Sequence, residues 1–367
     1  MRTDTSPSLF NSTRHLERAA QARLLIAITF HFVEGRLTYL DKVLQSLAAF
    51  PISRRDIVVY TNTTAITEQE SIRGLFCRAG LVDGHDARLA VEADLTHPFN
   101  LTWAHKKLIS GAFLAPDSPY SHFVYIEDDL QLTYENFVYF LAARDFLRPF
   151  NDLVPSFLRT EWSAERQRLV NPDATGAIRL AGKPFISHDG YAFVNLDIPY
   201  CAGFILDRDL ARKYVKSRSF DFKRSCEVSP FELRERAAMG LMFENPPAPF
   251  TYRCAVPVSI LTRVVPQCAW LAHLPNTYAD IPNHPHGFGS MAITDLFADD
   301  FNAKNEVTLL SFKTRIVLLL LLGWGYRRLP LDKRVALKKV LFECYGGIQR
   351  RNSGSPCREV NKNSGSC

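Results

Sequence analysis

The sequence lacks any apolar run long enough to cross a membrane. Its longest unbroken run, Ile316–Leu322, has seven of the 367 residues, whereas a bilayer span needs about 20. It also lacks internal repeats and low-complexity blocks, which excludes solenoid and collagen-like proteins. Hydrophobic residues make up 47% of the chain and aromatic residues 12%, so there is ample material for a large buried core.

Cysteines in metal-site spacing are also missing. None of the eight cysteines forms a CxxC pair, and their spacings match no zinc module. We interpret them as reduced thiols of a cytoplasmic protein, because disulfides follow oxidising compartments. Residues 1–20 are polar, have no signal-peptide pattern, and are expected to form a flexible leader. Glycosylation sequons begin at Asn11, Asn62 and Asn100; they would be used only in the alternative location, the lumen of the secretory pathway.

Positive charge is concentrated at one end of the chain. From Lys304 to Cys367 there are 13 Lys/Arg against 4 Asp/Glu, a net charge of +9, so residues 1–303 carry −3 of the total of +6. We predict a domain boundary here and a basic, amphipathic, helical C-terminal extension over 304–367 that lies on an anionic membrane surface. The alternative is a terminal helix whose leucines pack on the core. Nothing in the remaining sequence favours a nucleic-acid partner.

The first half of the chain alternates between two patterns. Leu24–Phe30, Asp56–Tyr60 and Phe123–Ile126 are short, apolar and rich in β-branched residues, as buried strands are. Segments with helical periodicity separate them. The sequence therefore predicts an α/β fold with a Rossmann-type, mostly parallel sheet flanked by helices, in a single domain spanning 21–303.

Three carboxylates, Glu127, Asp128 and Asp129, directly follow the third of these strands. Adjacent carboxylates raise one another's pKa unless a cation neutralises them. A hard divalent ion does so and can also hold a diphosphate. The alternative is a solvated loop whose acids favour the start of the next helix.

The acidic tripeptide carries a family resemblance. Ile126–Leu130, followed by the aromatic-rich segment Tyr134–Phe140, resembles the metal-binding motif of GT-A fold glycosyltransferases, and most nearly that of the N-acetylglucosaminyltransferase I type. The resemblance implies a GT-A-like fold, with 21–150 as the nucleotide-sugar half and 151–303 as the acceptor half. It also implies Mn²⁺ or Mg²⁺ as the cofactor.

The same resemblance assigns roles to the three acids. Asp129 would bind the metal, Glu127 would support it from the same loop, and Asp128 would face the sugar or ribose. Many members of the superfamily also return a C-terminal histidine to the metal. His273, which follows an apolar stretch and precedes a Pro-Asn turn, is the candidate for that third position.

Other residues fall in the order that the resemblance implies. Thr61 and Asn62 would hold the nucleoside, and His105 and Lys106 would flank the donor. Gly203 would let the backbone approach a sugar closely. The alternatives are a solvated helix face for the His-Lys pair and a small residue in a packed strand for the glycine.

An inverting transferase needs a carboxylate to accept the proton of the acceptor hydroxyl. In the segment Cys226–Arg236 we expect Glu232 to be this base, with Glu227 and Glu235 as rivals. The alternative is an ordinary surface helix with Glu/Arg pairs.

A further pair, Arg159 and Glu161, lies between the acidic motif and the acceptor half. They would grip sugar hydroxyls or pair with each other. His284 and His286 are expected in a loop near the acceptor.

Together these features predict a metal-dependent glycosyltransferase of the hexosyltransferase type. It would move a sugar from a nucleotide-sugar donor, UDP-linked by expectation, to a glycan or lipid-linked acceptor. The basic extension fits surface polysaccharide assembly on the inner face of a membrane. The alternatives are a non-catalytic α/β binding protein with a structural cation site, and a nucleotidyltransferase.

Overall fold

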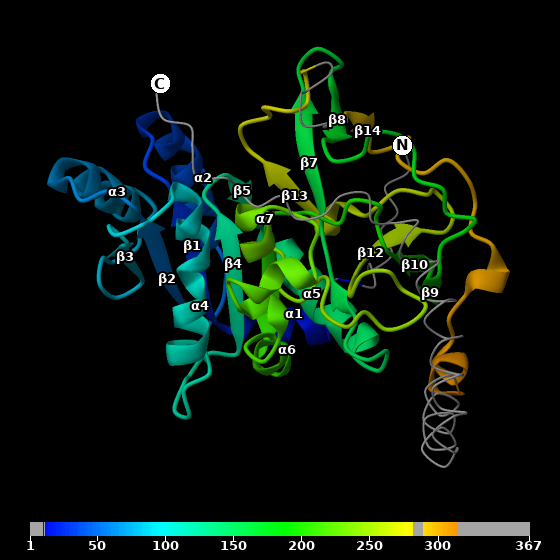
Figure 1. Ribbon diagram of the computed structural model, residues 1–367. Helices are drawn as coiled ribbons and strands as arrows, with labels where there is room; N and C mark the ends of the chain where they lie inside the picture. Colours follow the sequence, from blue (N-terminus) through cyan, green and yellow to red (C-terminus); the bar gives the residue numbers. More distant parts are fainter. Residues whose placement is uncertain (1–9, 11, 282–288, 315–367) are drawn as a thin grey trace, which may run out of the picture. The chain divides into compact units, whose positions relative to one another are not determined.

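The computed structural model describes residues 10, 12–281 and 289–314. The chain divides into a compact unit of residues 1–307 and a second unit of residues 308–367. The described residues of the first unit form three sheets and the helices that cover them (Figure 1).

The central sheet has the strand order β11-β4-β1-β2-β3. Its strands are β1 (Arg23–Phe30), β2 (Arg54–Thr61), β3 (Ala87–Val91), β4 (His122–Glu127) and β11 (Gly203–Asp207). The first four are parallel, and β11 joins the edge antiparallel to β4. Seven of the eight residues of β1 are buried, as expected for a strand covered by helices on both faces.

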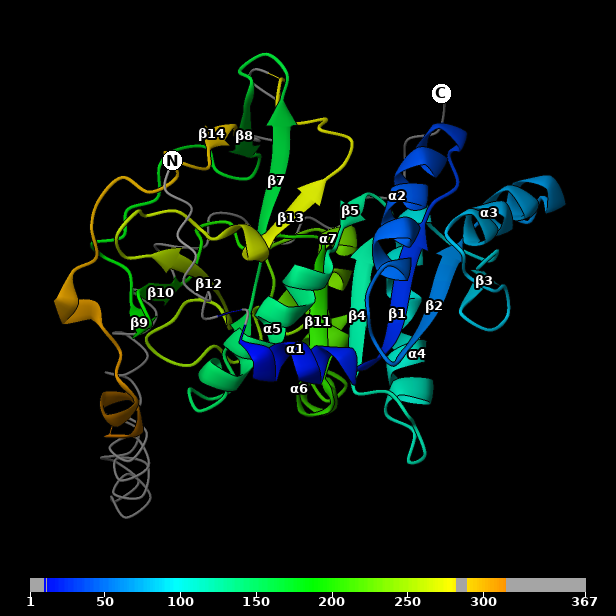
Figure 2. The same cartoon turned by 180° about the vertical axis from the view of Figure 1, so that it is seen from behind.

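Helices cover both faces of this sheet (Figures 1 and 2). One face carries α1 (Thr13–Ala20), α2 (Leu37–Ala48), α3 (Ile66–Arg78) and α5 (Tyr134–Leu147). The other face carries α4 (His105–Leu108), the π-helical turn η4 (Ile109–Phe113) and α6 (Arg208–Tyr214). The predicted class, an α/β fold with a mostly parallel sheet flanked by helices, is confirmed.

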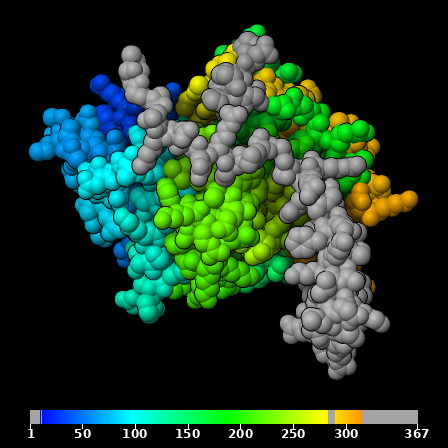
Figure 3. All heavy atoms as spheres, viewed as in Figure 1, coloured from blue at the N-terminus to red at the C-terminus, as the bar shows by residue number. Residues whose placement is uncertain are grey.

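Short helical segments complete the unit. They are η2 (Glu34–Arg36), η3 (Pro98–Trp103), η5 (Arg218–Phe220), η6 (Arg224–Glu227), α7 (Leu233–Ala237), η7 (Gln267–Ala269) and η8 (Ala303–Asn305). In the space-filling view, the cyan surface near residue 100 adjoins the yellow-green surface near residue 230 (Figure 3), where η3 packs against α7.

Local sequence explains the elements nearest the acidic motif. In α2 the residues Leu40, Val43, Leu44 and Leu47 are buried, which is the predicted helical spacing of apolar residues. Thr133 begins α5 with a capping box, in which its side chain and that of Asn136 each accept a backbone N–H.

The other two sheets are mostly antiparallel. One has the order β6-β12-β10-β9 and the other β14-β8-β7-β13-β5. Their strands are β5 (Leu130–Gln131), β6 (Val154–Pro155), β7 (Leu158–Ser163), β8 (Arg168–Asn171), β9 (Phe185–His188), β10 (Tyr191–Val194), β12 (Cys254–Ser259), β13 (Trp270–His273) and β14 (Met291–Ala292).

One pairing in the last sheet positions the site. Strand β5 begins immediately after the acidic tripeptide and pairs with β13, so that Leu130 lies opposite His273. Asn136 of α5 also donates hydrogen bonds to the carbonyls of Cys268 and Trp270, both 2.8 Å long. The last residue of β13 is therefore held beside the acids, although the two segments are far apart in the sequence.

The ends of the chain differ in part from expectation. The prediction of a flexible leader over 1–20 is wrong for residues 13–20, which form α1 and pack on α5, with Phe10 buried nearby. The amphipathic α1 needed a partner surface that the sequence does not display. The compact unit ends at Val307, close to the boundary predicted before Lys304.

Most of the basic extension, residues 315–367, lies outside the described residues. Residues 309–314 are helical. Within the described part of the chain, no helix is both long and apolar enough to cross a bilayer.

Candidate functional site

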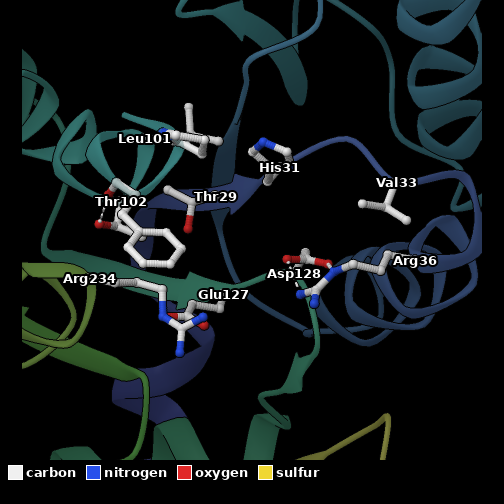
Figure 4. Close-up of a pocket in the computed structure, with 11 residues that line it drawn as sticks. Thr29, His31, Val33, Arg36, Leu101, Thr102, Glu127, Asp128 and Arg234 are labelled. Carbon is white, nitrogen blue, oxygen red and sulfur yellow. Dashed lines mark hydrogen bonds and ion pairs between the residues drawn. The ribbon is translucent and has the colours of Figure 1, made fainter. Parts of the chain in front are cut away.

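A pocket of about 280 Å³ opens at the carboxyl ends of β1 and β4 (Figure 4). It is lined by Thr29, His31, Val33 and Arg36 from β1 and the segment after it, by Pro98, Phe99, Leu101 and Thr102 of η3, and by Glu127, Asp128 and Arg234. Parallel α/β sheets bind ligands at this edge because the strand ends leave a crevice between the following loops. The acidic motif therefore borders a cavity.

Arg36 binds two of the three acids. Its Nε and Nη2 donate to Oδ2 and Oδ1 of Asp128 at 2.9 and 2.7 Å, and Nη2 also donates to Oδ2 of Asp129 at 2.9 Å. Both aspartates are almost fully buried, with 3% and 4% of their surface exposed. The guanidinium thus neutralises carboxylates that would otherwise repel each other in a site of low dielectric.

A chain of three side chains leads away from Asp129. Its Oδ2 lies 3.3 Å from Nε2 of His273, and Nδ1 of His273 lies 2.6 Å from Oε1 of Glu161. A carboxylate only accepts hydrogen bonds, so Nδ1 carries a proton. The backbone N–H of Tyr278 donates to the other oxygen of Glu161 at 2.9 Å. Glu161 therefore fixes the orientation of the imidazole ring.

The electrostatics of this chain are asymmetric. Burial alone would raise the pKa of Asp129, but the hydrogen bond and charge of His273, together with Arg36, hold that pKa below its ordinary value. Burial would lower the pKa of His273, but its bonds to Asp129 and Glu161 raise it instead. The pair therefore favours a carboxylate beside an imidazolium.

Glu127 lies on the other side of the pocket, toward α7 (Figure 4). Tyr200 donates to its Oε1 at 3.2 Å. Burial, and then the charge of Asp129, raise the pKa of Glu127 to about 7, while Arg234 opposes the rise. Glu127 is consequently set apart from the two aspartates that Arg36 binds.

The residues present fit a divalent cation at Asp129. Oδ1 of this residue is buried and has no hydrogen-bond partner among the described residues. A neutral histidine that donates Nδ1 to a carboxylate presents Nε2 in the manner of a metal ligand, so a cation here would displace the proton that Nε2 of His273 holds toward Asp129. Within the described ranges, however, no group of three or more His, Cys, Asp or Glu side chains is arranged to hold a metal ion. The remaining ligands would be phosphate and water oxygens, which Mg²⁺ commonly keeps.

The residues predicted to hold the nucleoside do not line the pocket. Thr61 is fully buried at the end of β2. Asn62 accepts a hydrogen bond from the backbone N–H of Phe32 at 2.9 Å. Its observed role is to fix the segment that follows β1, which supplies part of the pocket wall.

His105 and Lys106 are not a solvated pair and do not reach the pocket. His105 is fully buried, with Nδ1 2.7 Å from the carbonyl of Thr102. Nζ of Lys106 donates to the carbonyls of Ser219 and Phe220 at 2.7 and 3.0 Å and lies 3.7 Å from the centre of the Trp103 ring. Both readings offered by the sequence are corrected, because both side chains serve packing behind η3.

Gly203 has a packing role as well. It lies opposite Ile126 in the register of β11 and β4, and a Cβ there would be 2.9 Å from the carbonyl oxygen of Tyr125. The glycine therefore permits close contact between β11 and β4 beside the acidic motif. The backbone that it lets approach is that of Tyr125, where the sequence predicted a sugar.

The structure separates the candidate bases. Glu232 is exposed and precedes α7 as its N-cap residue. Glu227 is in η6. Glu235 lies within α7 next to Arg234, with Oε2 buried and without a hydrogen-bond partner among the described residues. The charge of Glu235 helps to raise the pKa of Glu127, which lines the pocket. Glu235 is therefore the candidate base that interacts with the pocket.

Arg159 and Glu161 do not pair with each other. Arg159 forms a buried ion pair with Asp173 and lies over the rings of Tyr200 and Tyr278 at 5.3 Å. Glu161 binds His273 instead. His284 and His286 lie outside the described residues.

Sequence reasoning missed the two arginines of the pocket. Arg36 belongs to η2, and Arg234 belongs to α7. Arg36 reaches two of the acids through tertiary contacts, and Arg234 acts on Glu127 through its charge. The only available signal was that three adjacent buried carboxylates require cations.

Comparisons with known proteins give limited likeness. No protein-family model matches the chain, and no curated protein matches it. A crystal structure of S. aureus TarS is similar with a TM-score of 0.34 and 13% identity, over 59% of this chain and 33% of that chain. A structure of S. aureus TarS 1–349 is similar with a TM-score of 0.32 and 12% identity, over 52% of this chain and 48% of that one. The match thus spans less than half of either TarS chain, and a likeness of this size does not assign a function.

Proposed function

We propose that this chain is a metal-dependent glycosyltransferase that uses a nucleotide-sugar donor. The observation that carries the proposal is the meeting of Asp129 with His273, next to Asp128, which lines the pocket. Asp129 immediately precedes β5, His273 is the last residue of β13, and Glu161 orients the imidazole. An acidic strand end, a returning histidine and a cavity between the strand-end loops together suit a diphosphate bound through a cation.

Asp129 and His273 would hold the cation, which would be Mn²⁺ or Mg²⁺. When bound, the ion would neutralise charge on the departing nucleoside diphosphate. The protein's part is to keep the two ligands in place. Glu161 does this for the imidazole, and the backbone N–H of Leu274 does it for the motif by donating to the carbonyl of Asp129 at 2.9 Å.

The pocket itself would take the nucleoside. Three of the four η3 residues that line it are apolar, and Phe99 is 41% exposed, with the guanidinium of Arg234 5.4 Å from the centre of its ring. An exposed ring in a concave site is a platform on which a planar base can stack. UDP is the donor nucleotide that we propose to test first.

Glu235 is our proposal for the base that accepts the acceptor's proton, in preference to Glu232. Its buried, unpartnered Oε2 is an acceptor that the described protein leaves unused. Glu232, in contrast, is exposed, so that no packing fixes the position of its carboxylate. A base must lie within hydrogen-bond reach of the hydroxyl it activates, and a rigid helix position serves this better than an exposed cap.

The wider assignments remain part of the proposal. A hexosyl donor, a glycan or lipid-linked acceptor, surface polysaccharide assembly, and a peripheral position on the cytoplasmic membrane face all extend from it. Nucleic acid is not among the proposed partners. The membrane part is tested by sedimentation with anionic vesicles before and after removal of residues 308–367; unchanged vesicle binding would refute it.

The decisive experiment is calorimetric titration of UDP with and without Mn²⁺. The wild type is expected to bind UDP only with the metal, and Asp129→Ala and His273→Ala are expected to lose this binding. Asp300→Ala and His85→Ala are matched controls, because both side chains are exposed, at 83% and 76%. A screen of donor hydrolysis over several nucleotide sugars then tests transfer chemistry.

A non-catalytic binding protein is the second candidate. Arg36 supports it, because its guanidinium already neutralises Asp128 and Asp129. The acidic motif can therefore be explained without a catalytic metal. Metal binding without any nucleotide binding would favour this candidate. A nucleotidyltransferase would instead release pyrophosphate from a nucleoside triphosphate, and a pyrophosphate assay would detect it.

A further inference from the structure

Arg36 occupies the position from which a cation neutralises the acidic motif. It engages both oxygens of Asp128 and Oδ2 of Asp129, at distances of 2.7 to 2.9 Å. The one carboxylate oxygen that it leaves, Oδ1 of Asp129, is buried and has no hydrogen-bond partner among the described residues. The motif is therefore satisfied only in part by the arginine.

The partners differ in their freedom to move. The side chains of Asp128 and Asp129 are 4% and 6% exposed, whereas that of Arg36 is 36% exposed and lines the pocket (Figure 4). Arg36 is at the end of the short η2, next to the first turn of α2. The acids are fixed by their surroundings, so it is the arginine that can leave without opening the core.

A divalent ion held by Asp129 and His273 would sit beside this guanidinium, because Oδ2 of Asp129 faces both Nη2 of Arg36 and Nε2 of His273. Two cations a few ångströms apart repel strongly at a buried site. A guanidinium also binds phosphate in the same bidentate way as it binds a carboxylate. A diphosphate in the pocket would thus offer Arg36 a replacement partner.

We propose that Arg36 and a divalent cation compete for Asp128 and Asp129, and that Arg36 passes to the phosphates of a bound nucleotide when the cation is loaded. The second clause rests on the proposed function; the first does not. It follows that the cation and the nucleotide bind with positive coupling, because each favours the same displaced position of Arg36. Arg36 is a positioning residue that keeps the free site from taking up metal alone.

The test measures Mn²⁺ binding to the nucleotide-free full chain by calorimetry. Arg36→Ala is expected to bind Mn²⁺ at least tenfold more tightly than the wild type, and Arg36→Lys to lie between the two, because lysine keeps the charge and loses the bidentate contact. Arg54→Ala is the matched control. Arg54 makes the same bidentate contact with Asp56, at 2.9 and 2.9 Å, but at the exposed start of β2.

Loss of Arg36 leaves the buried Asp128 without its cation and Asp129 with His273 alone, so Arg36→Ala is also examined by thermal unfolding. Mn²⁺ is expected to raise its melting temperature by several degrees more than that of the wild type. Equal Mn²⁺ affinity and an equal melting shift for the two proteins would overturn the competition.

The nucleotide arm is kept separate. At saturating Mn²⁺, Arg36→Ala is expected to bind UDP at least tenfold more weakly than the wild type; unchanged UDP affinity would overturn the transfer to phosphate. If no variant binds UDP but Arg36→Ala gains Mn²⁺ affinity, the competition is supported and the proposed function is the part that fails.

Discussion

The two ends of strand β4 carry arginine–aspartate clusters that behave differently. Near its first residue, Arg144 binds Asp207 at 2.8 Å and Asp152 at 2.8 Å, and Asp207 lies opposite His122 in the sheet register. Beyond its last residue, Arg36 binds Asp128 and Asp129. Both clusters are charge-assisted and buried on the acid side. They differ in what surrounds the arginine.

The side chain of Arg144 is 4% exposed, and that of Arg36 is 36% exposed beside a pocket. Both oxygens of Asp207 accept hydrogen bonds, one from Arg144 and one from the backbone N–H of Leu210, which Asp207 caps at the start of α6. Asp129 keeps one oxygen without a partner in the described protein. We call the first cluster closed, because its arginine is buried and both oxygens of Asp207 are used, and the second open, because its arginine is partly exposed and one acceptor oxygen is unused.

The largest expected effect comes from breaking the closed cluster. Arg144→Met should lower the free energy of unfolding by about 3 kcal/mol, because it leaves the buried Asp207 without its nearest cation and half-buried Asp152 with Lys213 alone. Urea unfolding measures this. Arg212→Met, which breaks an exposed pair with Asp209 at 3.0 Å, should change stability by less than about 1 kcal/mol. Equal effects of the two variants would contradict the distinction between the clusters.

The next effect reverses the pattern at the open cluster. Asp129→Asn should reduce Mn²⁺-dependent UDP affinity about a hundredfold, roughly 2.7 kcal/mol, while stability changes by less than about 1 kcal/mol, since the amide oxygen still accepts from Arg36. Asp207→Asn should do the opposite, with stability lost and UDP affinity kept. Calorimetry and urea unfolding on both variants provide the comparison. A large stability loss in Asp129→Asn would make the open cluster structural too.

The sequence was informative where a local pattern has one physical outcome. The apolar run of β1 is buried as predicted, and the leucines of α2 face the core. Glu127 ends β4 and, together with Asp128, lines the pocket. His273 lies 3.3 Å from Asp129, a position that the family resemblance suggested and that no spacing in the sequence required.

The sequence was uninformative where burial depends on distant segments. The sequence predicts Lys106 as a solvated residue or a donor contact, yet it is 7% exposed, because η5 supplies two carbonyls and Trp103 a ring. Arg36 gave no signal at all. Its partners are 92 and 93 residues away, and a charged side chain outside a motif is exposed by default.

The third prediction sharpens the role of the open cluster by acting one step behind it. Glu161→Gln should weaken Mn²⁺-dependent UDP affinity about tenfold, because the imidazole of His273 loses the carboxylate that orients it. Calorimetric titration at fixed Mn²⁺ is the measurement. Glu165→Gln changes an exposed glutamate after the same strand and should have no effect. A loss equal in both variants would show that Glu161 does not act through His273.

The last prediction concerns Lys106, a buried lysine that has no carboxylate partner among the described residues. In the described part of the chain, no carboxylate lies within ion-pair distance of Lys106, whose Nζ is held by two carbonyls and three aromatic rings. Burial lowers its pKa to about 6, with Asp221 opposing the shift and Arg236 adding to it. Such a lysine should make stability depend on pH.

Between pH 6 and 10.5 the unfolded chain holds a proton on Lys106 that the folded chain lacks. The free energy of unfolding therefore rises with pH through this window, by about 1 kcal/mol per unit from this group. Lys106→Met should remove that slope, which urea unfolding at pH 7, 8 and 9 measures against the wild type. Lys107→Met is the matched control, because Lys107 is the next residue, its side chain is 81% exposed, and it pairs only weakly with Glu92. If Lys106→Met and the wild type keep the same slope, Lys106 stays charged in the folded protein. The carbonyls and rings would then stabilise a buried cation as well as the aspartates do at either end of β4.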